Sequence, residues 1–147
     1  MRIAFGIVIT VGVGLSIPGA WAEPPLYYVA TNGNDAWSGT LPAPNAEGTD
    51  GPFATLLRAR EALRKVGTAE GLPEGGTVYV REGTYYLTEP LRLEAVDAGV
   101  SDKPALWQAY ARETVRLVAG KRVPEFSAYK DQILQSDLSG LDLPETP

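Results

Sequence analysis

The chain has 147 residues, with 13 Lys and Arg against 18 Asp and Glu, a formal net charge of −5, and neither histidine nor cysteine. An acidic chain of this kind is repelled by phosphate backbones, so we expect no nucleic-acid partner. The missing residue types exclude Ser-His-Asp and Cys-His catalysis, zinc sites of His and Cys, and a disulfide-stapled scaffold. The sequence also lacks a phosphate-cradling glycine loop and a dinucleotide-binding glycine motif.

The first 22 residues have the pattern of a secretory signal peptide. Arg2 supplies positive charge, residues 3–17 are apolar and uncharged, and Ala-Trp-Ala at positions 20–22 is an A-x-A cleavage site. A retained membrane anchor is the alternative, although Pro18 interrupts the apolar run. The pattern predicts secretion to the extracellular space or the periplasm, a mature chain that starts at Glu23, and no transmembrane segment after cleavage.

Residues 55–66 are predicted to form the one α-helix of the chain. Thr55 suits the N-cap position, and Gly67 suits the position just after the helix. Apolar residues recur at helical spacing, and we expect them to form one buried stripe: Leu56, Ala59, Leu63 and Val66.

Strand patterns lie on both sides of this helix. Residues 26–30 precede it, and residues 31–52 between them are rich in turn formers. Behind it, apolar residues alternate with polar ones at residues 78–81, 84–87, 91–94, 106–110 and 115–118, with one more strand near 133–138. Short strands without intervening helices predict an all-β architecture with one helix, and the pattern fits a sandwich as well as a solenoid. In a solenoid, the helix would cover the open end of the core.

A family resemblance favours the solenoid. The segments YYVATNGNDAWSGT, ATLLRAREAL and GGTVYVREGTYYL are followed by LWQAY and VRLVAGKRV. In order and spacing, residues 26–123 resemble the N-terminal entry of secreted right-handed parallel β-helix proteins, the pectate-lyase-like superfamily. The resemblance implies an N-terminal cap with a capping helix and the first rungs of the β-helix in residues 23–124. Residues 125–147 would be an incomplete C-terminal segment with no terminal cap.

The same resemblance implies a carbohydrate-active protein of the polysaccharide lyase or glycoside hydrolase type. The catalytic groups of those families have no matching positions here, so no catalytic residue is assigned, and we expect the isolated chain to be inactive. Two alternatives stay open: a non-catalytic glycan-binding or cell-surface β-helix module, and a truncated product without independent function.

Aromatic side chains are abundant for a small domain and suggest where a glycan would bind. A sugar ring has an apolar face and a polar rim, which flat aromatic rings with polar edges complement. Core packing and strand propensity are the alternative explanation. The carbohydrate-binding candidates are Trp37, Tyr79, Tyr86 and Trp107.

Oxygen-bearing side chains at Asn32, Asn34 and Asp35 gather in one turn, which is the ligand chemistry that Ca²⁺ prefers. Turn formation explains the same residues, so we expect no cofactor, with Ca²⁺ as the alternative. The remaining charged candidates are predicted to be solvated surface groups rather than a catalytic pair or a lyase base: Glu82, Glu89, Glu94, Asp97, Arg81, Arg92 and Arg116.

Overall fold

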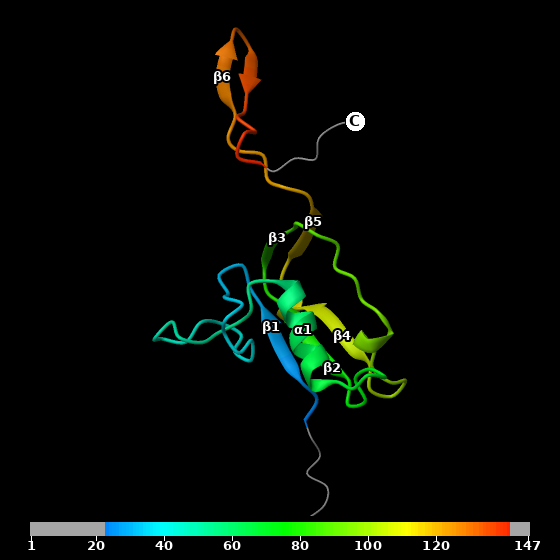
Figure 1. Ribbon diagram of the computed structural model, residues 1–147. Coiled ribbons are helices and arrows are strands. Elements are labelled where there is room, and N and C mark those ends of the chain that lie inside the picture. Colours follow the sequence, from blue (N-terminus) through cyan, green and yellow to red (C-terminus); the bar gives the residue numbers. More distant parts are fainter. Residues whose placement is uncertain (1–22, 142–147) are drawn as a thin grey trace, which may run out of the picture.

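A computed structural model describes residues 23–141 of the chain (Figure 1). The predicted signal peptide and its cleavage site lie outside the described residues. Within the described range, no helix is both long enough and apolar enough to cross a membrane.

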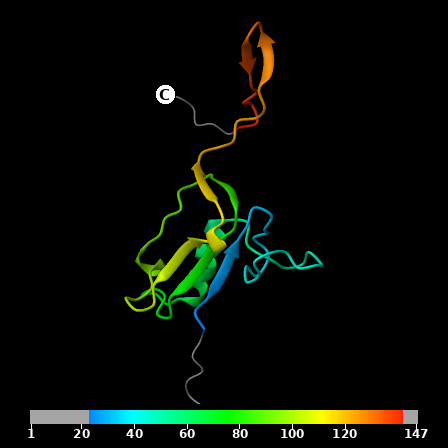
Figure 2. The same cartoon turned by 180° about the vertical axis from the view of Figure 1, so that it is seen from behind.

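Five strands form two small parallel sheets. β1 (Leu26–Val29), β2 (Gly76–Val80) and β4 (Ala105–Ala109) pair in that order, and β3 (Gly83–Leu87) pairs with β5 (Val115–Ala119). Each consecutive strand pair, β2–β3 and then β4–β5, therefore contributes one strand to each sheet (Figures 1 and 2). The prediction of mostly β structure with one helix is confirmed. The pairing is parallel, unlike that of an antiparallel sandwich, and neither sheet closes on itself.

The predicted helix is present as α1 (Leu56–Val66), with Thr55 at the N-cap as expected and Gly67 at the C-cap rather than one position beyond it. The Thr55 hydroxyl accepts a hydrogen bond from the Arg58 amide at 3.1 Å, and the Gly67 amide donates to the Leu63 carbonyl at 3.0 Å. Both bonds satisfy backbone groups that the helix itself leaves unpaired. The helix lies across one face of the β1–β2–β4 sheet (Figure 1).

The core lies between α1 and the two sheets. Leu56, Ala59 and Leu63 are buried there as predicted, but Val66 is 55% exposed, so its predicted burial is wrong. Val66 stands in the last turn of α1, beyond the packed side chains, and Ala62 is buried in its place. The cluster of buried residues is Val29, Phe53, Leu56, Ala59, Ala62, Leu63, Leu72, Val78, Val80 and Tyr85.

A buried ion pair fastens α1 to the segment after β3. Asp97 in the short 3-10 helix η1 (Ala95–Asp97) is only 4% exposed, so its prediction as a solvated surface charge is wrong. Arg64 of α1 donates to both of its carboxylate oxygens, at 2.6 and 2.7 Å, and to Glu94 at 3.0 Å. A bidentate pair of this geometry is what allows a charged group to be buried.

One strand prediction was wrong, and another was right in part. Residues 91–94 form no strand, and their alternating pattern leads into η1 instead. The single strand expected near 133–138 is half of an antiparallel hairpin, β6 (Ser127–Lys130) and β7 (Ile133–Gln135), which projects from the body of the molecule (Figure 1). Because the hairpin pairs with itself, it does not extend either parallel sheet.

The packing of α1 can be tested by placing a charge in the core. We expect Leu63→Asp to lower the free energy of unfolding by on the order of 3 kcal/mol or more, because Leu63 is 1% exposed and an unpaired carboxylate would be buried. Val66→Asp is the matched control on the same helix and should change stability by less than about 0.5 kcal/mol. Urea denaturation measures both, and equal losses would contradict this packing.

The ion pair predicts how stability depends on pH. Hydrogen bonds from Arg64 lower the pKa of Asp97 from its ordinary value. The contribution of Asp97 to stability is therefore complete above the pKa of the unfolded carboxyl, about 3.9, and is lost as the pH falls through the lower folded pKa. We expect Asp97→Asn to be less stable than the wild type at neutral pH and to lose less stability on acidification.

Asp102→Asn is the control for that experiment, since it makes the same chemical change at an exposed carboxylate. Thermal unfolding between neutral and acidic pH gives the comparison. An Asp97→Asn profile parallel to that of the wild type would show that the pair has no role in stability.

Candidate functional site

Three tyrosines form a cluster on the face of the β1–β2–β4 sheet that points away from α1. Tyr28 on β1 and Tyr79 on β2 are register partners, so their rings lie side by side, with centroids 5.7 Å apart and planes inclined by 26°. Tyr110, directly after β4, meets both rings edge-on at 5.7 and 5.4 Å. All three are half-buried, and together they are called the tyrosine cluster below.

The alternation of the strands explains why the tyrosines face outward. Val29 and Val80 are buried under α1, so the preceding residues Tyr28 and Tyr79 must point to the opposite face. Figure 2 shows this face of the sheet with α1 behind it. Burial raises the pKa of Tyr28, and the neighbouring Tyr110 and Tyr79 add to this shift. The Tyr28 hydroxyl therefore stays protonated and can donate a hydrogen bond at neutral pH.

Arg81 and Glu113 form an ion pair at the end of the cluster. Arg81 Nε and Nη2 each lie 2.9 Å from a Glu113 carboxylate oxygen, and the guanidinium stands 4.9 Å from the centre of the Tyr110 ring. Arg81 also donates to the carbonyl of Pro42, which ties the loop after β1 to the sheet. This arrangement fixes the position of Tyr110 through a cation–π contact.

The carboxylate of Glu113 is held in its ionised form. It accepts hydrogen bonds from Arg81 and, at 2.8 Å, from the Glu82 amide, and Arg81 is the larger cause of its lowered pKa. In turn, hydrogen bonding to Glu113 raises the pKa of Arg81. The pair is charge-balanced, so the cluster presents rings and hydroxyl groups to a ligand rather than a strong net charge.

The four predicted sugar-binding residues are not gathered in one place. Tyr79 belongs to the tyrosine cluster, but Trp107 is on the core side of the sheet, opposite Val78 in the register. Trp37 lies in the loop after β1 against Gly51, and Tyr86 is exposed on β3. Sequence reasoning chose Tyr79 and missed its partners Tyr28 and Tyr110. Aligning LYYVA with TVYVR at their buried valines would have indicated the Tyr28–Tyr79 pair.

The predicted turn residues brace the start of α1. Asp35 Oδ1 accepts the amides of Ala54 and Thr55 at 2.8 and 2.9 Å, and Oδ2 accepts the Thr55 hydroxyl at 2.8 Å. Asn34 accepts the amide of Ala36 at 2.9 Å, as in an Asx turn. Asn32 is exposed in the same turn. Residues 23–141 contain no group of three or more His, Cys, Asp or Glu side chains that could hold a metal ion.

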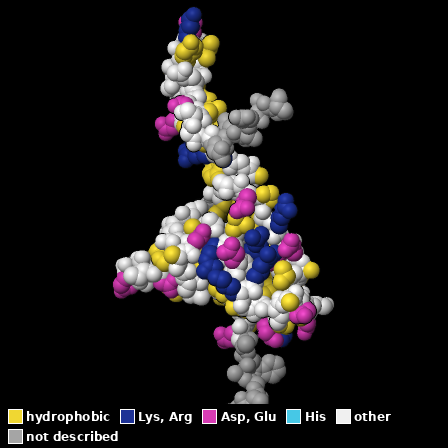
Figure 3. All heavy atoms as spheres, viewed as in Figure 1, with side chains coloured by type: hydrophobic (Ala, Val, Ile, Leu, Met, Phe, Trp, Pro, Cys, Tyr) yellow, Lys and Arg dark blue, Asp and Glu magenta, His cyan; other side chains and the backbone are white. Residues whose placement is uncertain are grey.

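Basic side chains collect on the opposite side of the molecule. Figure 3 shows Lys and Arg over α1, with acidic side chains among them. The arginines there are tied to local acceptors: Arg64 to Asp97, Arg58 to the carbonyl of Asp35 and Arg60 to that of Arg92. These guanidinium groups hold the helix to its surroundings, which is a structural role.

Comparisons with known proteins give two structural neighbours. No family matches the chain, and no curated protein is similar to it. A solved structure described as a glycoside hydrolase is similar over 71% of this chain and 16% of its own length, with 28% identity and a TM-score of 0.59. A rhamnogalacturonan lyase matches over 66% of this chain and 23% of its own, with 22% identity and a TM-score of 0.41. The likeness to the glycoside hydrolase supports a carbohydrate-related function in a coarse sense, and this chain spans only 16% of the length of that protein.

Proposed function

We propose that the chain is the N-terminal part of a secreted carbohydrate-active protein and that its tyrosine cluster binds polysaccharide. The observation that carries the proposal is the cluster itself: three tyrosine rings on the open face of a parallel sheet, fixed by an ion pair. Rings with polar edges suit the apolar face and wet rim of a sugar. The likeness to a glycoside hydrolase supports the same reading, although this chain corresponds to only a small part of that protein.

We further propose that the two parallel sheets are the first rungs of a right-handed parallel β-helix with α1 as its cap. The repeated unit supports this: β2–β3 and β4–β5 each follow the same course and stack in parallel register. The helix also covers the core beside β1, the first strand of the stack. Stacked repeats bury a continuous core only in combination with their neighbours.

Binding rather than hydrolysis is the activity that suits these residues. A glycosidase needs a carboxylic acid with a raised pKa to protonate the leaving group. Glu113 is the carboxylate paired with Arg81 beside the cluster, and its pKa is lowered, so it remains an anion at neutral pH. The Arg81 guanidinium beside it is bound in the same ion pair, which raises its pKa, so it stays protonated and cannot serve as a base.

Removal of one ring should weaken glycan binding. We expect Tyr79→Ala to reduce affinity for a bound polysaccharide about fivefold, because aromatic contacts contribute about 1 kcal/mol beyond area burial. Tyr79→Phe should retain most of the binding, and Tyr129→Ala on the exposed hairpin should retain all of it. Affinity electrophoresis through xylan, β-glucan, pectin and alginate measures the change. Failure of the wild type to bind any glycan would overturn the proposal.

The purified chain should bind polysaccharide without cleaving it. The ionised state of Glu113 leaves the cluster without a general acid, so we expect neither new reducing ends nor unsaturated sugar ends. Both products can be followed with the same four polysaccharides. Sustained turnover by a folded, monodisperse sample would show that a catalytic site is present in the chain.

A further inference from the structure

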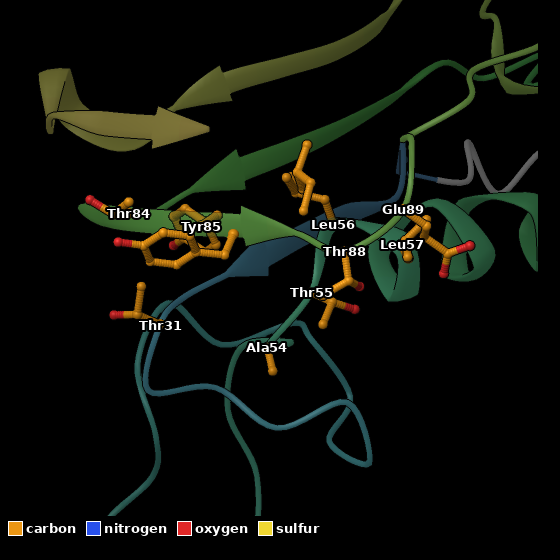
Figure 4. A pocket seen from close by; sticks show the side chains of 11 residues that line it. Thr31, Ala54, Thr55, Leu56, Leu57, Thr84, Tyr85, Thr88 and Glu89 are labelled. Atoms are coloured by element: carbon orange, nitrogen blue, oxygen red, sulfur yellow. The ribbon is translucent and has the colours of Figure 1, made fainter. Parts of the chain in front are cut away.

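A pocket of ≈ 240 Å³ lies between the start of α1 and β3, separate from the tyrosine cluster (Figure 4). Its walls are Thr31, residues 54–57 at the N-terminal end of α1, and the six consecutive residues 84–89. None of these residues belongs to the tyrosine cluster or to the Arg81–Glu113 pair. The pocket is therefore a concave site that is separate from the tyrosine cluster.

One wall of the pocket is an open strand edge. β3 pairs only with β5 among the described strands, and the Gly83 amide donates to the Thr114 carbonyl on that side. In a parallel strand, the amide and carbonyl of one residue point to one edge, and those of the next residue point to the opposite edge. The amides and carbonyls of Thr84 and Tyr86 therefore point to the edge of β3 that faces away from β5. No residue within 23–141 pairs with them there. The pocket thus offers backbone donors and acceptors to a ligand.

The corresponding edge of the first sheet is closed. The loop after β1 forms backbone hydrogen bonds with that edge. The Tyr28 amide donates to the Gly39 carbonyl at 2.7 Å, and the Phe53 amide donates to the Tyr28 carbonyl at 2.8 Å. The loop after β1 therefore covers the edge of β1, whereas the corresponding edge of β3 is open. An uncovered edge is a liability unless it is short or used for binding.

The side chains of the pocket combine hydroxyl groups with an apolar floor. Thr55 uses its hydroxyl on Asp35 and Arg58, whereas the hydroxyls of Thr31, Thr84 and Thr88 bond to no other described residue. Leucine side chains and the Tyr85 ring supply apolar surface, and Tyr86 is 45% exposed. The charged side chain among the lining residues is Glu89, with no Lys or Arg beside it in the lining.

We propose that this pocket binds one neutral sugar unit, which makes it a second glycan site and rests on the carbohydrate-binding function proposed above. Hydroxyl groups and free peptide groups match the many hydroxyls of a sugar, and the apolar floor matches its ring face. Glu89 and the net charge of −5 disfavour a uronic acid. The volume lies below the range of pockets for drug-sized ligands, so it suits a single unit rather than an added peptide strand.

The test uses the full purified chain and amide chemical shifts during titration with xylotriose, with a galacturonic acid trisaccharide as the charged counterpart. We expect xylotriose to shift the amides of Thr84, Tyr86 and Thr88, and the charged trisaccharide to shift them much less. Thr84→Val with Thr88→Val should weaken this binding about thirtyfold, since two hydrogen bonds of about 1 kcal/mol each are lost at constant shape. Thr114→Val, an exposed threonine outside the pocket, is the matched control.

The outcomes separate this site from the tyrosine cluster. Tyr79→Ala should leave the xylotriose shifts at residues 84–88 unchanged. Shifts confined to Tyr28, Tyr79 and Tyr110 would overturn the pocket proposal and leave the proposed function standing, whereas no glycan binding by the wild type would overturn both. Shifts at 84–88 caused by an extended pentapeptide, with none caused by xylotriose, would make the edge a strand-docking site and also overturn the proposal.

Discussion

In-register parallel pairing of β1, β2 and β4 is the constraint on which the rest of the structure depends. Strand residues alternate between two faces, so aligning Val29 with Val80 places a buried row under α1 and a tyrosine row on the other side. A shift of one residue would exchange the two rows and expose the valines. The core therefore enforces the register, and the register brings Tyr28 and Tyr79 together.

The position of α1 follows from polar contacts at both ends as much as from its apolar stripe. Asp35 accepts two backbone amides just before the helix, which satisfies donors that α1 cannot satisfy itself. Near the other end, Arg64 reaches the buried carboxylate of Asp97. These contacts link α1 to the loop after β1 and to η1, and they hold it over the strands whose outer face carries the tyrosine cluster.

Local patterns predicted the elements well and the long-range contacts poorly. Periodicity located the helix and the strands β1 to β5 but not their parallel pairing, and the N-cap at Thr55 follows from its residue type. The burial of Asp97 could not be predicted, because it depends on Arg64, a partner 33 residues away. For the candidate site, Tyr79 was within reach of sequence reasoning, but the contacts of Tyr110 with Tyr28 and Tyr79 depend on the pairing of three strands that lie far apart in the sequence.

A left-handed turn follows Tyr110, beside the cluster that is proposed above to bind glycan. Ala111 and Arg112 have φ values of 44° and 67°, in the left-handed region that residues with side chains rarely adopt. They stand between Tyr110 and Glu113, both of which contact the Arg81 guanidinium. Left-handed backbone at such residues costs on the order of 1 kcal/mol each and persists where surrounding contacts fix the chain. Here those contacts are the ones that orient the rings, so the strained turn and the ion pair together hold Tyr110 against Tyr28 and Tyr79.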